Sequence, residues 1–141
     1  MLSIKKAKYM GLFRMIAGVL LLSILSAGVS LAKCAPPHIG ISVKEAAPNS
    51  LITITGKSFR DRCNDDGGTA FPAKDIRILF VQGDLKTELG RVDANSSFEI
   101  PSTIVTIPKD AKRGSASIIV ETVYERARLE IPASITVTPQ N

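Results

Sequence analysis

The sequence predicts an all-β domain, an antiparallel β-sandwich of seven or eight short strands preceded by an N-terminal hydrophobic helix. Two observations point to this class: apolar and polar residues alternate along many short segments, and turn-forming residues separate those segments at fairly regular spacing. A third is that the chain beyond the apolar segment lacks the periodicity of an amphipathic helix. Strands without helices to cover them are typical of two sheets packed on one core.

The N-terminal segment, residues 1–32, has the composition of a secretory signal. An apolar run from Met15 to Ala32 contains no charged side chain, and it follows four basic residues: Lys5, Lys6, Lys8 and Arg14. A basic start, an apolar run and small residues at a peptidase site are the layout of such a signal. Ser30 and Ala32 supply the small residues, so we expect cleavage before Lys33 and a secreted or otherwise extracytoplasmic domain at 33–141.

A retained membrane anchor is the alternative for residues 15–32. Their 18 uncharged positions are at the lower limit of what crosses a bilayer. Six small residues dilute the run and favour a signal: Ala17, Gly18, Ser23, Ser26, Ala27 and Gly28. Contact with a membrane is expected only in the anchored case.

The charge balance gives no indication of a nucleic-acid partner. The chain has 18 Lys and Arg against 13 Asp and Glu, and four of the basic residues belong to the signal. The remaining domain is therefore close to neutral, with no run of five like charges. It has neither the basic stripe nor the aromatic platform that nucleic-acid binding uses.

The two cysteines, Cys34 and Cys63, form an even pair in an exported chain, which predicts a disulfide. Such a bridge closes a loop of about 30 residues and contributes about 3.5 kcal/mol on the chain-entropy model. One cysteine precedes the first expected strand and the other lies in a long loop. We therefore expect the bridge to staple one end of the sandwich instead of joining its two sheets.

The first two strands flank a short turn. Alternation from Ile39 to Lys44 predicts a half-buried strand. Residues 46–50, which include a proline and an asparagine, predict a turn. The β-branched run from Leu51 to Thr55 predicts the next strand, and Gly56 ends it.

A long loop and a hairpin come next. Residues 57–74 carry acidic residues, glycines and a proline without periodicity, and Cys63 lies within them. The run 75–82 predicts a strand, a Gly-Asp turn follows, and residues 86–92 return as its antiparallel partner.

Three further strands complete the domain. Residues 98–107 are extended but contain Pro101, which belongs at an edge or a bulge because proline lacks an N–H. Alternation from Ala116 to Tyr124 predicts a strand, and residues 128–138 predict the last one.

One segment of the domain, P-N-S-L-I-T-I-T-G-K-S-F at 48–59, resembles the opening of immunoglobulin-like modules of the IPT/TIG type. Two later segments, L-G-R-V-D-A-N-S-S-F at 89–98 and I-P-K-D-A-K-R-G at 107–114, resemble exported bacterial repeats of a related kind. The resemblance implies an immunoglobulin-like sandwich of the kind found in exported bacterial surface proteins. Gly56 and Gly114 stand where strands end, so we expect positive φ at both. Phe59 is expected to fold back over the end of the core.

No catalytic, cofactor or metal site is expected, and the chain is interpreted as a non-enzyme. The only histidine, His38, follows two prolines, and no serine has the glycine pattern of a nucleophile elbow. A calcium site is an alternative interpretation of the acidic loop residues Asp61, Asn64, Asp65 and Asp66. Their spacing does not match an EF-hand loop, and nearby basic residues offset their charge, so a solvated loop is preferred.

Recognition by a surface remains the expected function. We expect a partner, a protein or a glycan of the cell envelope, to contact the tip of the long loop, because a tethered loop loses less entropy on binding. The predicted contact residues are Gly67, Gly68, Thr69, Ala70 and Phe71. The alternative is a structural or accessory envelope domain, tethered to a membrane if the N-terminal segment is retained, without a ligand of its own.

Overall fold

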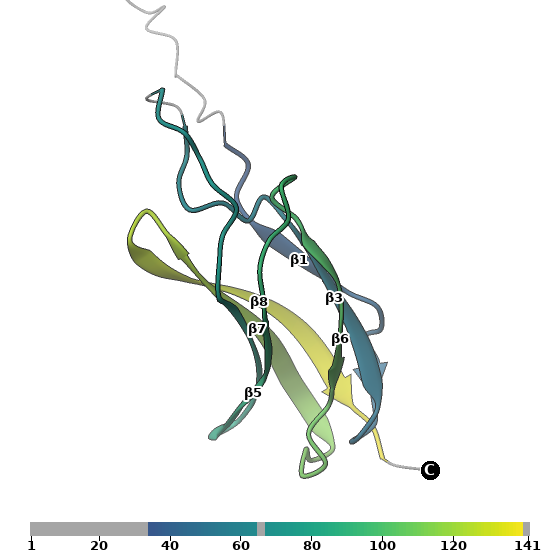
Figure 1. The fold of residues 1–141 in the computed structure, drawn as a ribbon. Helices are drawn as coiled ribbons and strands as arrows, with labels where there is room; N and C mark the ends of the chain where they lie inside the picture. Colours follow the sequence, from purple (N-terminus) through teal and green to yellow (C-terminus); the bar gives the residue numbers. More distant parts are fainter. Residues whose placement is uncertain (1–33, 65–66, 140–141) are drawn as a thin grey trace, which may run out of the picture. The chain divides into compact units, whose positions relative to one another are not determined.

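A computed structural model describes residues 34–64 and 67–139, and this part of the chain is all-β with no helix (Figure 1). The strands are β1 (His38–Ile41), β2 (Glu45–Ala46), β3 (Leu51–Lys57), β4 (Ile76–Gln82), β5 (Leu85–Val92), β6 (Ile100–Thr106), β7 (Gly114–Tyr124) and β8 (Ala127–Val137). The all-β prediction is confirmed. The predicted signal or anchor at 1–32 lies outside the described residues. Within the described ranges, no helical stretch has the length and apolarity needed to cross a bilayer.

The strands form two sheets, of three and five strands. The first has the order β1-β3-β6 and the second has the order β2-β8-β7-β4-β5. Every pairing is antiparallel except the short parallel contact of β2 with the end of β8. Pro101 lies at an irregularity in the β3–β6 register, where Ile54 pairs with Thr103 but Gly56 pairs with Ile100. The expected place of Pro101, at an edge or a bulge, is therefore confirmed.

β2 differs from the prediction. Ala46 was expected to begin a turn, but Glu45 and Ala46 pair with Thr136 and Val137. Two further backbone bonds extend this contact: the N–H of Thr136 donates to the Lys44 carbonyl at 2.9 Å and the N–H of Thr138 donates to the Ala46 carbonyl at 3.0 Å. The chain thus leaves one sheet after β1 and joins the other at β2.

The inward-facing side chains of both sheets form one apolar core. Its largest fully buried members come from β3, β4, β6, β7 and β8 and from the loops next to them: Ile52, Ile54, Phe59, Ile76, Ile78, Phe80, Ile100, Ile107, Ile118, Val120 and Val137. Burying one such side chain contributes about 2 kcal/mol. The alternation read from the sequence therefore corresponds to which face of each strand meets the core.

Gly56 is required for a reason other than the expected one. The φ of Gly56 is not positive, so the expectation of a positive φ there was wrong. The same expectation for Gly114 is confirmed, since its φ is 129°. A Cβ on Gly56 would lie 2.6 Å from Cε2 of the Phe59 ring and 3.0 Å from Cδ1 of Ile100. The Phe59 ring is fully buried, as expected of a residue that closes the core. The positive φ falls instead at Ser58, at 65°, where the chain turns back.

A network of ion pairs covers the outer face of the five-stranded sheet. Glu121 on β7 is only 3% exposed, and its carboxylate accepts hydrogen bonds from Arg77 at 2.7 Å and Lys86 at 3.0 Å. Arg77 also contacts Glu88 at 2.8 Å, so the network spans β7, β4 and β5. Leu79, which pairs with Ile119 of β7 and Glu88 of β5, is buried although it lies on this outer face.

Acid is expected to weaken the fold in part through Glu121. The Lys86 ammonium, helped by the charges of Arg77 and Arg128, holds the pKa of Glu121 below its ordinary value of 4.5 against the opposing effect of burial. This stabilisation is full above pH 4.5 and is lost as the pH falls through the lower pKa of the folded state.

The contribution can be measured by urea unfolding at about pH 7 and about pH 3. Glu121→Gln should be less stable than the wild type at the higher pH and should lose less stability on acidification. Glu130→Gln, at the exposed position on β8 that pairs with Glu121, is the matched control. Equal pH dependence in the Glu121 variant and the wild type would contradict this assignment.

Candidate functional site

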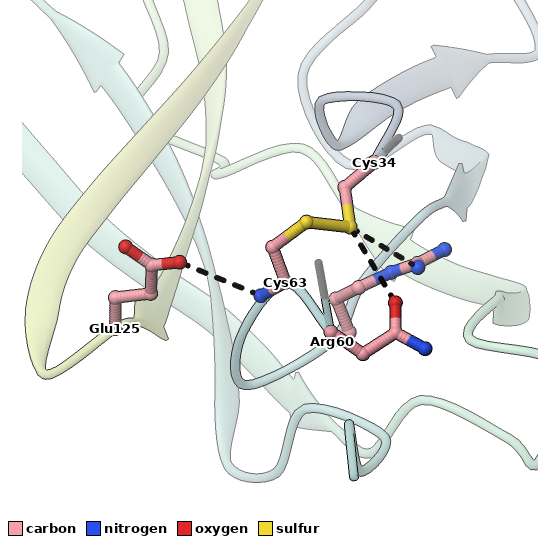
Figure 2. Close-up of a disulfide and its surroundings, with 5 residues drawn as sticks. Cys34, Arg60, Cys63 and Glu125 are labelled. Carbon is pink, nitrogen blue, oxygen red and sulfur yellow. Dashed lines mark hydrogen bonds between the residues drawn. A yellow bond between two sulfur atoms is a disulfide. The ribbon is translucent and has the colours of Figure 1, made fainter. Parts of the chain in front are cut away.

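A disulfide ties the long loop to the start of the domain (Figure 2). Cys34 and Cys63 are bonded, with their Cα atoms 5.8 Å apart, which confirms the predicted pairing. Cys34 precedes β1 and Cys63 lies between β3 and β4, so the bridge staples one end of the domain as expected. We call residues 57–64 and 67–74, with this bridge, the clasped loop.

Backbone hydrogen bonds close the clasped loop on itself. Arg60 and Pro72 form an isolated antiparallel bridge, and the N–H of Asp61 donates to the Phe71 carbonyl at 2.9 Å. The N–H of Phe71 donates in return to the Asp61 carboxylate at 2.8 Å. This bond, with the Arg62 guanidinium beside it, holds the pKa of Asp61 below its ordinary value against the effect of burial. The loop therefore has a fixed base.

A third tie joins the clasped loop to the turn between β7 and β8. The N–H of Glu125 donates to the Asp61 carbonyl at 2.7 Å, and the N–H of Cys63 donates to the Glu125 carboxylate at 3.5 Å. Glu125 and Arg126 both have positive φ, as in the tight turns that suit the twist of a hairpin. An open depression lies between the two elements, lined by Asp61, Arg62, Cys63, Val123, Glu125 and Arg126.

The Arg60 side chain lies between the disulfide and the Phe98 ring. Its guanidinium carbon is 4.7 Å from the centre of the Phe98 ring, within cation–π range, and its Nη1 is 3.8 Å from the sulfur of Cys34. Its Nε is buried without a hydrogen-bond partner in the described part of the chain. Arg60 thus fills the space between the bridge and the loop before β6, and the ring holds it there.

The predicted contact residues lie on the outer part of the clasped loop. Gly67, Gly68 and Thr69 are exposed, Ala70 is half-buried, and Phe71 is 58% exposed. Gly67 has φ 83°, which a glycine accommodates without strain. The exposed Phe71 ring is an apolar group on a segment whose backbone is fixed.

The sequence did not indicate that a second apolar group, Val123, stands beside this loop. Val123 is 59% exposed and lines the depression with Asp61 and Cys63. The alternating pattern that predicted this strand did not indicate that the end of β7 lies next to the clasped loop. Glu125 and Arg126 were missed for the same reason.

The residues considered for metal binding and catalysis do not gather into one site in the described part of the chain. The Asp61 carboxylate accepts the Phe71 N–H, and Oδ1 of Asn64 lies 3.8 Å from the sulfur of Cys34. Asp65 and Asp66 lie outside the described residues. His38 is exposed on β1 and pairs in register with Lys57. Within residues 34–64 and 67–139, no three His, Cys, Asp or Glu side chains gather as a metal site would require.

Another depression lies near the opposite end of the five-stranded sheet. It is lined by Ile39, Ile41, Lys44, Val81, Gln82, Gly83, Ser115, Ala116, Ser117, Ala133, Ser134, Ile135 and Thr136. Its polar groups are mostly hydroxyls. Gln82 already bonds both backbone groups of Lys112, so its amide holds the neighbouring loop in place. This depression lacks the exposed apolar anchor that the clasped loop presents.

Comparisons with known proteins show the fold alone. No family model and no curated protein sequence matches the chain. Among solved structures, Cwp6 from Clostridium difficile is similar, with a TM-score of 0.50 and 11% identity over 74% of this chain. Spo0M, a sporulation control protein from Bacillus subtilis, matches with a TM-score of 0.42 and 11% identity over 76%. The chain spans 17% of the first structure and 50% of the second.

Proposed function

We propose that this chain is an exported, non-catalytic immunoglobulin-like module of the IPT/TIG type. In this proposal it binds a protein or glycan of the cell envelope through the clasped loop. The observation that carries the proposal is an apolar group, Phe71, standing exposed on a backbone that several ties hold in place. An exposed aromatic residue on a preorganised loop is a typical binding anchor, because little entropy is lost when it is covered.

The surroundings of Phe71 support a binding surface of modest size. Asp61, whose carboxylate accepts the Phe71 N–H, lines a depression together with the exposed Val123 and with Arg62 and Arg126. An apolar centre with charged groups at its rim is the usual composition of a protein interface. The disulfide supports an oxidising location outside the cytoplasm.

Binding is expected to depend on Phe71. The probes are envelope fragments of the source cells, tested either intact or after protease digestion to leave the glycan. The wild-type protein should bind one of these preparations saturably, and Phe71→Ser should weaken that binding at least about tenfold. Retention after digestion would identify a glycan, and its loss would identify a protein.

Val43→Ser is the matched control for this experiment. Val43 is also an exposed apolar side chain, but it lies between β1 and β2 and is not part of the clasped loop. It should bind as the wild type does. Saturable binding that survives Phe71→Ser would move the site elsewhere on the domain. No saturable binding by the wild type would favour the accessory role over recognition.

A further inference from the structure

The free edge of β6 differs from the other sheet edges in the described part of the chain. An exposed edge is a template for pairing with another strand, and proteins protect edges with charge, proline, bulges or short length. β1 has four residues and β2 has two. β5 carries Lys86, Glu88 and Arg91 and contains an irregularity in its register with β4. The part of β8 that β2 leaves unpaired carries Arg128, Glu130 and Pro132.

β6 has little of this protection. Its sequence, I-P-S-T-I-V-T, contains no charged residue, and its single proline lies at the end where the register is already irregular. An open depression separates β6 from the edge of β5, with Thr87, Glu88 and Leu89 on one side and Ile104 to Pro108 on the other. β6 and β5 belong to different sheets, so no ladder hydrogen bonds join them, although the two edge strands lie near each other.

Two hydrogen bonds show which residues of β6 direct their backbone groups away from β3. The N–H of Ile107 donates to the Ser50 carbonyl at 2.9 Å, so Ile107 faces β3. The carbonyl of Thr53 accepts from Ser42 at 2.9 Å, on the β1 side, so Ile104, its partner on β6, is not bonded to it. Because bonding alternates along an antiparallel strand, Ile104 and Thr106 direct their N–H and C=O groups to the free edge.

Apolar side chains lie beside these free groups. Ile104 is 66% exposed, and Leu51 on the neighbouring β3 is 67% exposed. The register pairs Ile104 with Thr53 and Leu51 with Thr106, which makes Ile104 and Leu51 diagonal neighbours on the outer face of the sheet. The β6 edge therefore combines free backbone N–H and C=O groups with exposed apolar side chains.

We propose that β6 pairs antiparallel with β6 of a second copy of this chain. The twofold axis passes at Val105, so Ile104 of each copy faces Thr106 of the other and four backbone hydrogen bonds join the two strands. A second copy fits this edge because its β6 is equally uncharged, so the pairing buries no unpaired charge. The Ile104 side chains of the two copies meet diagonally and extend the apolar stripe begun by Leu51.

Thr106→Pro tests the pairing directly. Proline deletes the outward N–H of residue 106 and leaves the bonds of β6 to β3 in place, since proline is tolerated on an edge where its missing N–H faces solvent. Thr106→Val keeps this N–H and is the matched control. Sedimentation of the whole chain at concentrations up to about 100 µM measures the dissociation constant of the dimer. Association through any surface other than the β6 edge would be the same in both variants, so a difference between them reports on the β6 pairing.

The wild type and Thr106→Val should dimerise alike, while Thr106→Pro should raise the dissociation constant at least about tenfold. Hydrogen exchange at the Ile104 and Thr106 amides of the wild type should slow as the protein concentration rises. If Thr106→Pro fails to fold, Ile104→Lys, at a side chain already in solvent, gives the same test. A monomeric wild type, equal affinities, or exchange independent of concentration would each overturn the proposal.

Discussion

Gly56→Ala is expected to destabilise the domain by about 3 kcal/mol, a shift of roughly 13 °C in its melting temperature. The added methyl group would lie 2.6 Å from the Phe59 ring, and real Cβ atoms do not approach so closely. The ring cannot move aside freely because it is fully buried in the core. Thermal or urea unfolding followed by circular dichroism measures the loss.

Gly90→Ala is the matched control for this substitution. Gly90 also lies within a strand, has no positive φ, and has no atom within 4 Å of the position that a Cβ would take. Its replacement should change stability by less than about 0.5 kcal/mol. A smaller side chain at position 59 should relieve the clash, so Gly56→Ala with Phe59→Leu should cost less than the two changes added together. Equal stabilities of the two glycine variants would show that the Phe59 ring does not prevent a side chain at position 56.

Loss of the Cys34–Cys63 bridge is expected to cost about 3.5 kcal/mol, because the unfolded chain regains the freedom of the loop that the bridge closes. The bridge joins positions 29 residues apart. Urea unfolding of the Cys34→Ala, Cys63→Ala double variant measures the cost. The cavity contribution should be small, since both cysteines are only partly buried.

Reduction of the wild type offers an independent check on the same quantity. Wild-type protein unfolded in the presence of a dithiol reductant should match the double variant, and the variant itself should not respond to the reductant. If the contacts of Asp61 with Phe71 and Glu125 hold the folded loop without the bridge, the full loss is expected and Phe71-dependent binding should survive in the double variant. A loss below about 1 kcal/mol would mean that the folded loop also gains freedom when the bridge is removed, and would contradict this expectation.

The pattern of side chains predicted the strands where each one has a buried and an exposed face. β3 and β7 show this alternation clearly, and their buried positions lie in the core. β4 was predicted from a continuous apolar run. The structure explains that run, because Leu79 on its outer face lies among the ion-paired side chains of Arg77, Glu88 and Glu121. The cysteine pairing was predicted because the chain offers only two cysteines.

The features that the sequence did not predict all depend on contacts between distant segments. β2 is a strand only because the end of β8 lies beside it, and two residues carry no periodicity. Gly56 stands at a strand end, as many glycines with positive φ do, and nothing local reveals that Phe59 returns to it. The contact of Glu125 with Asp61 and Cys63 likewise joins a turn and a loop about 60 residues apart.

The short connection between β1 and β2 also restricts how this protein can be divided. Only residues 42–44 separate β1, in the three-stranded sheet, from β2, in the five-stranded sheet. The three-stranded sheet then draws β3 and β6 from either side of β4 and β5 along the chain. No single cut in the polypeptide therefore separates one layer from every strand of the other, and neither layer is available as a smaller autonomous building block.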